Sequence, residues 1–418
     1  MDLNKENIDV DYLPRLGYSR IVQNFVDEPV PFPLSRELEL LVQCARLQLE
    51  EVHCRRIQEL LEGELDWDRV YQAAEFHRLI PLLNLHLGRF GASVNNAAKA
   101  SLRSAAMAIL ATNMRLVGEL HELSRQLSMS HIPVLWFKGP ITAWESYHDL
   151  SLRPFLDLDL CVLRCDIEKT YELLTRLGYT PQFELSPLQR RILHKNYSEL
   201  CLWRGEPAII VDVHWELFQP GYSFSIAAEK IWKNHKMLTV NGHETPTLGD
   251  DDWLFFACVH ASKHCWNRIG WLVDITEHIR QCPADWDLLF RRPEARHAQR
   301  RLLITIGLVS NLDSTAIPDD IYRLFKSDNK AVRLVRRVIE GWERNLSHTA
   351  SWPHRDPHFL AYECASDRVT HLYRSFLRPT PLEWNLVPLP VFLHPLYFIF
   401  RPLRLIYRRL VGVGRVGS

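Results

Sequence analysis

The chain has 418 residues, enough for two or three domains, and its 47% hydrophobic and 24% charged residues are an ordinary globular balance. Its 50 basic and 50 acidic side chains give a formal net charge of zero. Duplex-binding proteins usually carry a basic excess or stripe, so no duplex nucleic acid is expected as a partner and a small anionic substrate is favoured. Binding of single strands or tRNA ends stays open, because local patches can hide in a neutral total.

Residues 1–34 are expected to form a flexible arm. This segment is polar and acidic, has no apolar signal core, and ends in Pro29, Pro31 and Pro33, which disfavour a helix. No run of 18 or more apolar residues occurs, so no membrane-spanning helix is expected. The nine cysteines are scattered without a Cys-x-x-Cys pair, which disfavours a zinc or disulfide framework and favours a cytoplasmic protein.

Residues 35–130 are predicted to form an N-terminal helical region. Ser35 is expected to cap a helix that runs through Leu61, and Asp66 is expected to cap the next helix. A long helix rich in Ala and Leu is expected over about 97–127.

Residues 131–225 are predicted to form a small mixed sheet with flanking helices. The expected strands are 134–137, 156–163, 180–184, 197–203 and 209–215, and the expected helices are 141–147 and 167–177. The pattern turns mostly helical from Ile226, which gives a helical domain over 226–378 in which Asp250 caps one helix and 268–280 forms its partner. The predicted fold class is therefore α+β, with a small mixed-sheet core flanked by N-terminal helices and a larger C-terminal helical domain.

Residues 379–418 form an apolar and basic C-terminal tail. The stretch 386–400 is strongly apolar but interrupted by prolines, and four arginines with interleaved apolar residues follow: Arg401, Arg404, Arg408 and Arg409. Two readings stay open. One is a basic amphipathic helix on an anionic membrane, which would give a peripheral membrane contact through 386–410. The other is a terminal element packed on the helical domain.

The stretch from Leu135 to Asp159 carries the strongest chemical signal. A short apolar run ends in Lys138 and Gly139, and Pro140 suits the first position of a helix. Free backbone N–H groups at such a helix start attract phosphate, and a glycine lets phosphate approach closely. Lys138 would neutralise triphosphate charge, although a surface lysine is the plainer alternative.

A pair of aspartates follows in a second apolar run. Alternation along a strand places Asp157 and Asp159 on one face, where two carboxylates repel each other unless a cation lies between them. Oxygen ligands of this kind suit Mg²⁺. Asp212 lies in another apolar strand and is the best third carboxylate for a site with two Mg²⁺ ions. A buried acid paired with Arg153 or Lys138 is the alternative for Asp212.

Further candidates surround these carboxylates. Arg153 would contact phosphate or brace the carboxylates, and His214 shares the face of Asp212, where it would orient the acceptor, act as a base or be a core histidine. His260, Lys263 and His264 lie at helical spacing on one face that could close over a nucleotide.

A residue on the following helix completes the candidate set. Asp274 could be a general base or a partner for Lys263. Zinc binding by His260 and His264 is disfavoured, because Ala261 stands where a zinc-binding His-Glu-x-x-His helix has Glu.

These motifs resemble those of the polymerase-beta-like nucleotidyltransferase superfamily: Lys-Gly at 138–139, Arg-Pro-x-x-Asp-x-Asp at 153–159, and Asp-x-His-Trp at 212–215. More narrowly, the chain resembles a bacterial family of uncharacterised nucleotidyltransferases found in surface-polysaccharide and peptide-biosynthesis gene clusters. Residues 260–275 are similar to that family's His-x-x-Lys-His-x-Trp-x-x-Leu-x-Trp-Leu-x-Asp segment, with Ile269 at the Leu position. The similarity covers roughly residues 35 to 410.

The chain departs from the wider superfamily at one place. Gly-Gly or Gly-Ser commonly follows the first strand there, whereas this chain has Gly139 and Pro140, which removes one phosphate-facing N–H and one hydroxyl.

The resemblance implies a minimal nucleotidyltransferase core over 131–225. It implies an Mg²⁺-dependent enzyme that moves a nucleoside monophosphate from an NTP, with ATP favoured, to a hydroxyl acceptor with release of pyrophosphate. Asp157, Asp159 and Asp212 would be the catalytic and metal-binding residues. The implied nucleotide-binding residues are Lys138, Gly139, Arg153, Lys263 and His264, and the acceptor or base candidates are His214, His260 and Asp274.

Two alternatives stay open. The first is a catalytically silent nucleotide-binding or scaffold protein, peripheral to the membrane through its tail. The intact acidic triad argues against it, because carboxylates that are costly to hold together should be lost from a retired site. The second is kinase-like transfer of the γ-phosphoryl group, which would release ADP rather than pyrophosphate.

Overall fold

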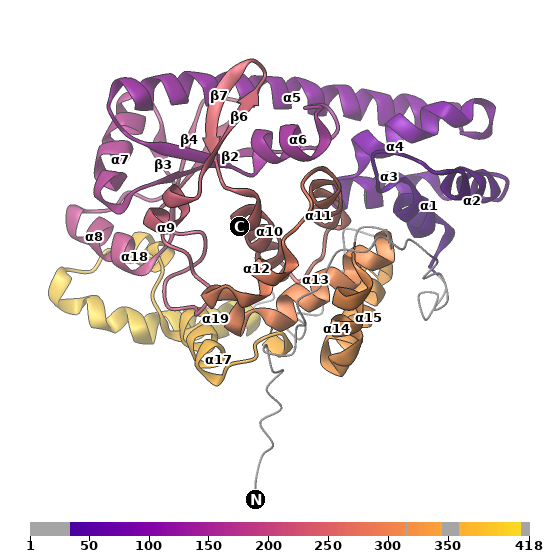
Figure 1. The fold of residues 1–418 in the computed structure, drawn as a ribbon. Helices are drawn as coiled ribbons and strands as arrows, with labels where there is room; N and C mark the ends of the chain where they lie inside the picture. The colour runs from indigo at the N-terminus through magenta and orange to yellow at the C-terminus, as the bar shows by residue number, and fades with distance from the viewer. Residues whose placement is uncertain (1–33, 314–316, 345–358, 411–418) are drawn as a thin grey trace, which may run out of the picture.

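A computed structural model describes residues 34–313, 317–344 and 359–410. The predicted arm therefore lies outside the described residues, apart from Leu34. The described chain forms a seven-stranded sheet with helices on both sides (Figure 1). This confirms the α+β class with a mixed sheet between N-terminal and C-terminal helices.

From Leu34 onward, the α-helices that precede the sheet are α1 (Arg36–Cys44), α2 (Glu51–Leu61), α3 (Trp67–Phe76), α4 (Ile80–Leu87) and α5 (Asn96–Met129). Ser35 and Asp66 cap α1 and α3 as predicted. The prediction of one helix over 35–61 was wrong, because the chain leaves the helix after Cys44. The buried guanidinium of Arg46 donates to the carbonyls of Gln43 and Val42, so it satisfies groups that a continuing helix would bond.

The sheet is built from β1 (Val134–Phe137), β2 (Asp157–Val162), β3 (Thr180–Pro181), β4 (Glu199–Arg204), β5 (Ile209–His214), β6 (Lys236–Val240) and β7 (His243–Thr247). Their order is β3-β4-β5-β2-β1-β7-β6. β2 runs antiparallel to β1 and parallel to β5, and β1 pairs in parallel with β7. The central strands thus follow the predicted positions closely, whereas β3 is shorter than expected.

The two faces of the sheet have different chemistry because of strand alternation. One face is apolar and packs in a single cluster with α5 and α7 (Ile167–Arg176); its residues include Leu158, Leu160 and Val211. The other face carries Asp157, Asp159 and Asp212 and looks toward the C-terminal helices. Figure 1 shows α5 along the apolar side and α10 and α11 on the opposite side.

The β6–β7 hairpin, which was not predicted from the sequence, interrupts the mostly helical chain after Ile226. Asn241 and Gly242 have φ of 48° and 82°, the left-handed values that a two-residue hairpin turn requires. The hairpin adds two strands to the edge of the sheet beside β1.

The C-terminal helices are α9 (Ala228–Lys233), α10 (Asp250–Lys263), α11 (Ile269–Gln281), α12 (Trp286–Arg291), α13 (Gln299–Leu312), α14 (Asp319–Ser327), α15 (Asn329–Arg344), α17 (Ala365–Leu372), α18 (Pro381–Leu386) and α19 (Tyr397–Leu410). A π-helical turn, η6 (Tyr373–Leu377), follows α17. The prediction that Asp250 caps α10 was wrong by one position, because Gly249 is the N-cap and the Asp250 carboxylate binds Lys236 instead.

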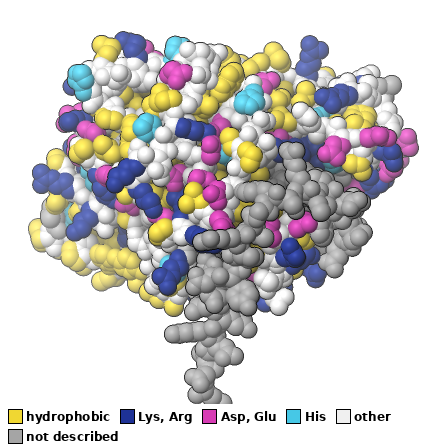
Figure 2. Space-filling model, in the orientation of Figure 1, with side chains coloured by type: hydrophobic (Ala, Val, Ile, Leu, Met, Phe, Trp, Pro, Cys, Tyr) yellow, Lys and Arg dark blue, Asp and Glu magenta, His cyan; other side chains and the backbone are white. Residues whose placement is uncertain are grey.

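The inner side of the tail packs on the protein. Arg401 and Arg404 bind the fully buried carboxylate of Glu383, and the buried Tyr397 donates to the carbonyl of Val387. The outer side of α19 exposes apolar residues at helical spacing: Ile399, Leu403, Ile406 and Tyr407. Figure 2 shows hydrophobic side chains gathered at the lower left, over the C-terminal elements. Among the described residues, no helix combines the length and apolar character that crossing a bilayer demands.

A buried histidine joins the N-terminal helices to α11. His77 is fully buried, and its Nδ1 accepts a hydrogen bond of 3.2 Å from the backbone N–H of Ile269. Burial, with a smaller contribution from Arg268, lowers the pKa of His77 to about 3. The imidazole is therefore neutral in the folded protein over a range where an unfolded chain protonates it.

We expect acid to destabilise the protein partly through His77. Between the unfolded pKa near 6.5 and the folded pKa, the unfolded state binds more protons than the folded state. The free energy of unfolding therefore decreases as the pH is lowered, by up to about 1.4 kcal/mol per pH unit for this group. His77→Asn, which keeps an acceptor atom, should give a flatter pH dependence than the wild type. Urea denaturation at pH 7, 6 and 5 measures it, and equal slopes for the two proteins would contradict the assignment.

Candidate active site

The three predicted carboxylates meet on one face of the sheet. Asp157 and Asp159 are two residues apart on β2, and the parallel pairing of β2 with β5 sets Asp159 directly opposite Asp212. Asp159 is buried, and Asp157 and Asp212 are partly exposed. Strand alternation and the pairing of β2 with β5 thus bring together the three aspartates that the sequence pattern predicted.

Asp159 is neutralised by two neighbours. Lys138 donates to Oδ1 of Asp159, and Nε2 of His214 lies 3.0 Å from the same oxygen. Burial alone would raise the pKa of Asp159, but Lys138 and His214 outweigh it and lower the pKa to about 2. The same attraction holds the pKa of Lys138 above its usual value despite the burial that opposes it. Asp159 and Lys138 therefore form a charged pair.

Asp157 and Asp212 lack such compensation. Burial and then repulsion by Asp159 raise the pKa of both, that of Asp212 to about 6. A cation between the carboxylates would remove this repulsion.

The donor atoms fit a divalent cation. Oδ2 of Asp159 is buried and has no hydrogen-bond partner. Ligand atoms of Asp159, Asp212 and His214 lie within 4.8 Å of one another. Carboxylate oxygens are the ligands that Mg²⁺ prefers, so the residues present suit this ion.

The turn between β1 and α6 (Gly139–Tyr147) lies against β2. Lys138 and Gly139 have φ of 56° and 38°, both left-handed. A Cβ at Gly139 would lie 3.0 Å from the backbone oxygen of Asp157, so a larger residue would push the helix start away from the carboxylates. The N-terminus of α6, which no side chain caps, therefore lies beside the acidic face.

Arg153 and Asp274 pair with each other across the layers. Nε of Arg153 lies 2.9 Å from Oδ1 of Asp274, which also accepts a bond of 2.8 Å from the hydroxyl of Tyr147. The buried amide of Asn113 on α5 donates to the carbonyls of Leu150 and Arg153 and fixes the loop that leads to β2. Asp274 is thus engaged by Arg153 rather than by Lys263.

The three candidates on α10 and at its end lie in an aromatic setting. His260 lies 5.4 Å from the ring of Phe256 and 4.9 Å from that of His264. Burial, followed by the charge of neighbours including Lys138, holds the pKa of His260 well below its usual range, so it is neutral. Lys263 and His264 are exposed at the C-terminal end of the helix.

Glu199 on β4 is a residue that the sequence reasoning missed. Its Oε2 lies 3.3 Å from Nδ1 of His214, so His214 is held between Glu199 and Asp159. Burial would raise the pKa of Glu199, but Lys263 and His214 bring it below its usual value. Alternation along the predicted strand 197–203 shows only which residues of that strand share a side with Glu199. The register that sets Glu199 opposite His214 is needed to assign it to the acidic face of the sheet.

Comparison with known proteins gives one family. A family model described as "Uncharacterised nucleotidyltransferase" matches residues 63–312, more than half of the chain. The matched range contains all three carboxylates, the Lys138–Gly139 turn and the segment from His260 to Asp274. No curated protein matches the chain.

Removal of the Asp274 carboxylate should destabilise the fold, because it leaves the buried Arg153 charge unpaired. We expect Asp274→Ala to lower the free energy of unfolding by about 3 kcal/mol. Asp287→Ala, which breaks an exposed pair with Arg291, should change it little. Chemical denaturation measures both. An Asp274→Ala protein that keeps wild-type stability but loses turnover would instead assign Asp274 to the chemistry.

Proposed function

The chain belongs to the family of uncharacterised nucleotidyltransferases, and we propose that it moves a nucleoside monophosphate from a nucleoside triphosphate to an acceptor hydroxyl with release of pyrophosphate. Family membership makes it a transferase of nucleotidyl groups with an unknown acceptor. The Mg²⁺ dependence, the preference for ATP and the roles of individual residues are part of the proposal.

The observation that carries this proposal is the acidic face beside the helix start. Three carboxylates from two paired strands meet within reach of a left-handed Lys-Gly turn, and one buried carboxylate oxygen lacks a partner. Two Mg²⁺ ions bound by Asp157, Asp159 and Asp212 would supply charge neutralisation for the triphosphate and a lowered pKa for the acceptor hydroxyl.

The chain's own residues position the reactants. The free N–H groups at the start of α6 and the ammonium of Lys138 would hold phosphate oxygens. Lys138 and His214 fix Oδ1 of Asp159, which leaves the buried Oδ2 without a partner and available to a metal ion. Arg153 contacts the carbonyl of Gly139 at the start of α6 at 3.4 Å, and it pairs with Asp274, which accepts a bond from Tyr147 at the end of the same helix.

Lys263, His264 and His260 flank this face from α10. We assign His264 to the nucleotide, Lys263 to the acceptor side of the reacting groups and His260 to the wall of the site. His214, held between two carboxylates, would steer the proton that leaves the acceptor hydroxyl.

Nucleotide binding tests the carboxylates. Asp157→Asn with Asp212→Asn should abolish Mg²⁺-dependent binding of nucleoside triphosphates. It should leave the melting temperature unchanged or raised, because it removes two repelled charges and spares the Asp159 pair with Lys138. Calorimetric titration with each ribonucleoside triphosphate, with and without Mg²⁺, measures the binding.

Glu172→Gln, an exposed change on α7, is the charge-matched control and should bind like the wild type. Binding that survives in the double variant would sink the metal assignment. Mg²⁺-dependent binding with ADP rather than pyrophosphate as the product would favour the kinase alternative. No nucleotide binding at all would favour the scaffold alternative.

We also propose that the outer side of α19 rests on an anionic bilayer, with the protein cytoplasmic. Leu403 and Ile406 are more than half exposed, and Arg408 follows them toward the end of the same helix. Apolar side chains flanked by basic ones are suited to the interface of an anionic membrane.

A vesicle experiment tests this contact. The wild type should sediment with phosphatidylglycerol vesicles, and Leu403→Asp with Ile406→Asp should reduce the bound fraction severalfold. Met107→Asp, which changes an equally exposed apolar residue on α5, is the control and should have no effect. Equal sedimentation of all three proteins would contradict the contact.

A further inference from the structure

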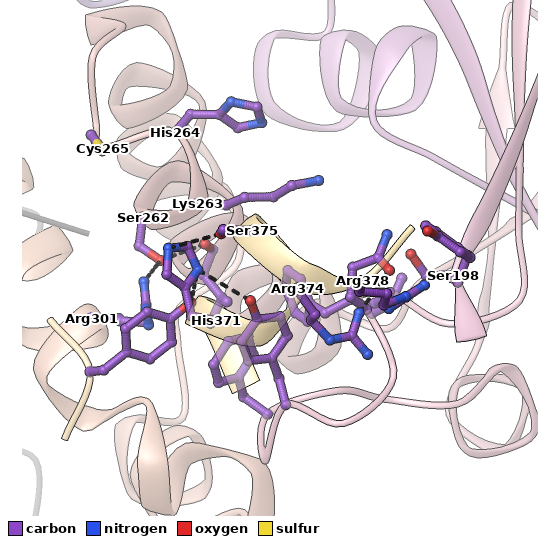
Figure 3. Close-up of a pocket in the computed structure, with 18 of the residues that line it drawn as sticks. Ser198, Ser262, Lys263, His264, Cys265, Arg301, His371, Arg374, Ser375 and Arg378 are labelled. Atoms are coloured by element: carbon purple, nitrogen blue, oxygen red, sulfur yellow. Dashed lines mark hydrogen bonds between the residues drawn. The ribbon is translucent and has the colours of Figure 1, made fainter. Parts of the chain in front are cut away.

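A large cavity lies beside the acidic face. Its volume is about 700 Å³, and it is lined by the residues just before β4, the loop after β5, α10, α13 and the C-terminal segment around η6. Figure 3 shows Lys263 and His264 on one side of it and Arg374, Arg378 and Ser198 on another. Its walls also carry aromatic rings, among them Tyr222 and Phe224.

The lining is cationic. Five basic side chains face the cavity (Lys263, Arg301, Arg374, Arg378 and Arg401), and none of the described lining residues is Asp or Glu. Arg401 is neutralised by Glu383. Within the described chain, Lys263, Arg374 and Arg378 take part in no ion pair.

The partners of Arg374, on η6, and of Arg378, directly after it, are neutral. Arg378 is buried and stacks over Tyr197 at 3.7 Å, and its Nη2 is buried without a hydrogen-bond partner. Arg374 donates to Oε1 of Gln219 at 3.0 Å and lies over the ring of Tyr222. Burial and then repulsion by Arg378 lower the pKa of Arg374. Both guanidinium groups are thus fixed in position by neutral partners. Holding their positive charges in a partly buried site without an anion costs free energy.

The cavity lies next to the reaction centre near the start of β4. Ser198 lines the cavity, and the next residue, Glu199, lies against His214, which binds Asp159. Lys263 lines the cavity and also lowers the pKa of Glu199.

The cavity and the Lys138–Gly139 turn lie toward different ends of β2. The turn contacts Asp157 at the start of β2, whereas His214 pairs with Cys161 near the end of that strand. Two anionic molecules could therefore reach the carboxylates from two sides.

We propose that this cavity binds the acceptor and that the acceptor carries a phosphate group beside a planar or apolar part. The proposal rests on the nucleotidyl transfer proposed above. Arg374, Arg378 and Lys263 bind the phosphate, because fixed guanidinium groups recognise it in bidentate geometry. The aromatic wall receives the remainder of the molecule. Arg374 and Arg378 lie beyond residue 312, where the family match ends, so they select the reactant from outside the matched region.

Phenyl phosphate is the probe, with phenol as its neutral counterpart, in calorimetric titration of the full chain without nucleotide or metal. We expect phenyl phosphate to bind and phenol to bind at least tenfold more weakly. Arg374→Gln and Arg378→Gln should each weaken the phosphate probe at least tenfold. Lys263→Gln, an exposed position where misfolding is not expected, should weaken it in the same direction.

Arg103→Gln, an exposed charge-matched change on α5, should leave affinity unchanged. Vesicles of phosphatidylcholine with phosphatidic acid distinguish the source of the phosphate. Binding of phenyl phosphate in solution that depends on Arg378 indicates a soluble acceptor, and binding of only the phosphatidic acid vesicles with the same dependence indicates a lipid-borne one.

Absence of both kinds of binding would overturn the proposal. So would displacement of phenyl phosphate by Mg²⁺–ATP together with weaker ATP binding in Arg378→Gln, since the cavity would then hold the donor triphosphate. The Asp157→Asn and Asp212→Asn variant separates the two proposals. This variant should lose nucleotide binding but still bind phenyl phosphate in the cavity. If the wild type binds phenyl phosphate but no nucleotide, the proposed nucleotidyl transfer is contradicted and the phosphate-binding cavity is not.

Discussion

Three carboxylates held on one face of a sheet repel one another, and the surrounding structure neutralises only one of them, Asp159. The ion pair of Lys138 with the buried Asp159 is the central contact, and His214 braces the same oxygen from the neighbouring strand. It requires the left-handed turn at 138–139, which in turn requires a glycine against β2. The positive charges of Lys138, Arg78 and Arg153 also act on Asp157 and only partly offset its burial and its repulsion by Asp159, so its pKa stays raised.

The sequence was most informative where local pattern and tertiary environment agree. Apolar strands with fixed alternation located β1, β2 and β5 within a residue of their observed ends. The sequence was least informative where a residue distant in the chain determines the local structure. Arg46 binds carbonyls at the end of α1 that a longer helix would use, and its guanidinium also donates to the carbonyl of Leu312. The β6–β7 hairpin was missed although Asn241-Gly242 is a strong turn signal, because its strands alternate weakly.

The site shows the same division. The residue types and spacings of Asp157, Asp159 and Asp212 were sufficient to group them. Glu199 joins that group only through strand register, and Arg153 proves to pair with Asp274, which lies 121 residues away in the chain. The basic cavity has no sequence signature, because Lys263, Arg374 and Arg378 come from segments with no common motif and meet only in the folded chain.

The wall of that cavity has a consequence for the order of synthesis. The strands that carry the carboxylates are complete by His214 and the sheet by Thr247, but η6, which carries Arg374 and precedes Arg378, is held by contacts that α19 supplies. Arg401 on α19 donates to the backbone carbonyls of Arg374 and Ser375 and ties η6 to Glu383. A chain emerging from the ribosome therefore has its acidic face long before the segment that closes the cavity is released. Reactive and selective parts of the protein become available at different times during translation.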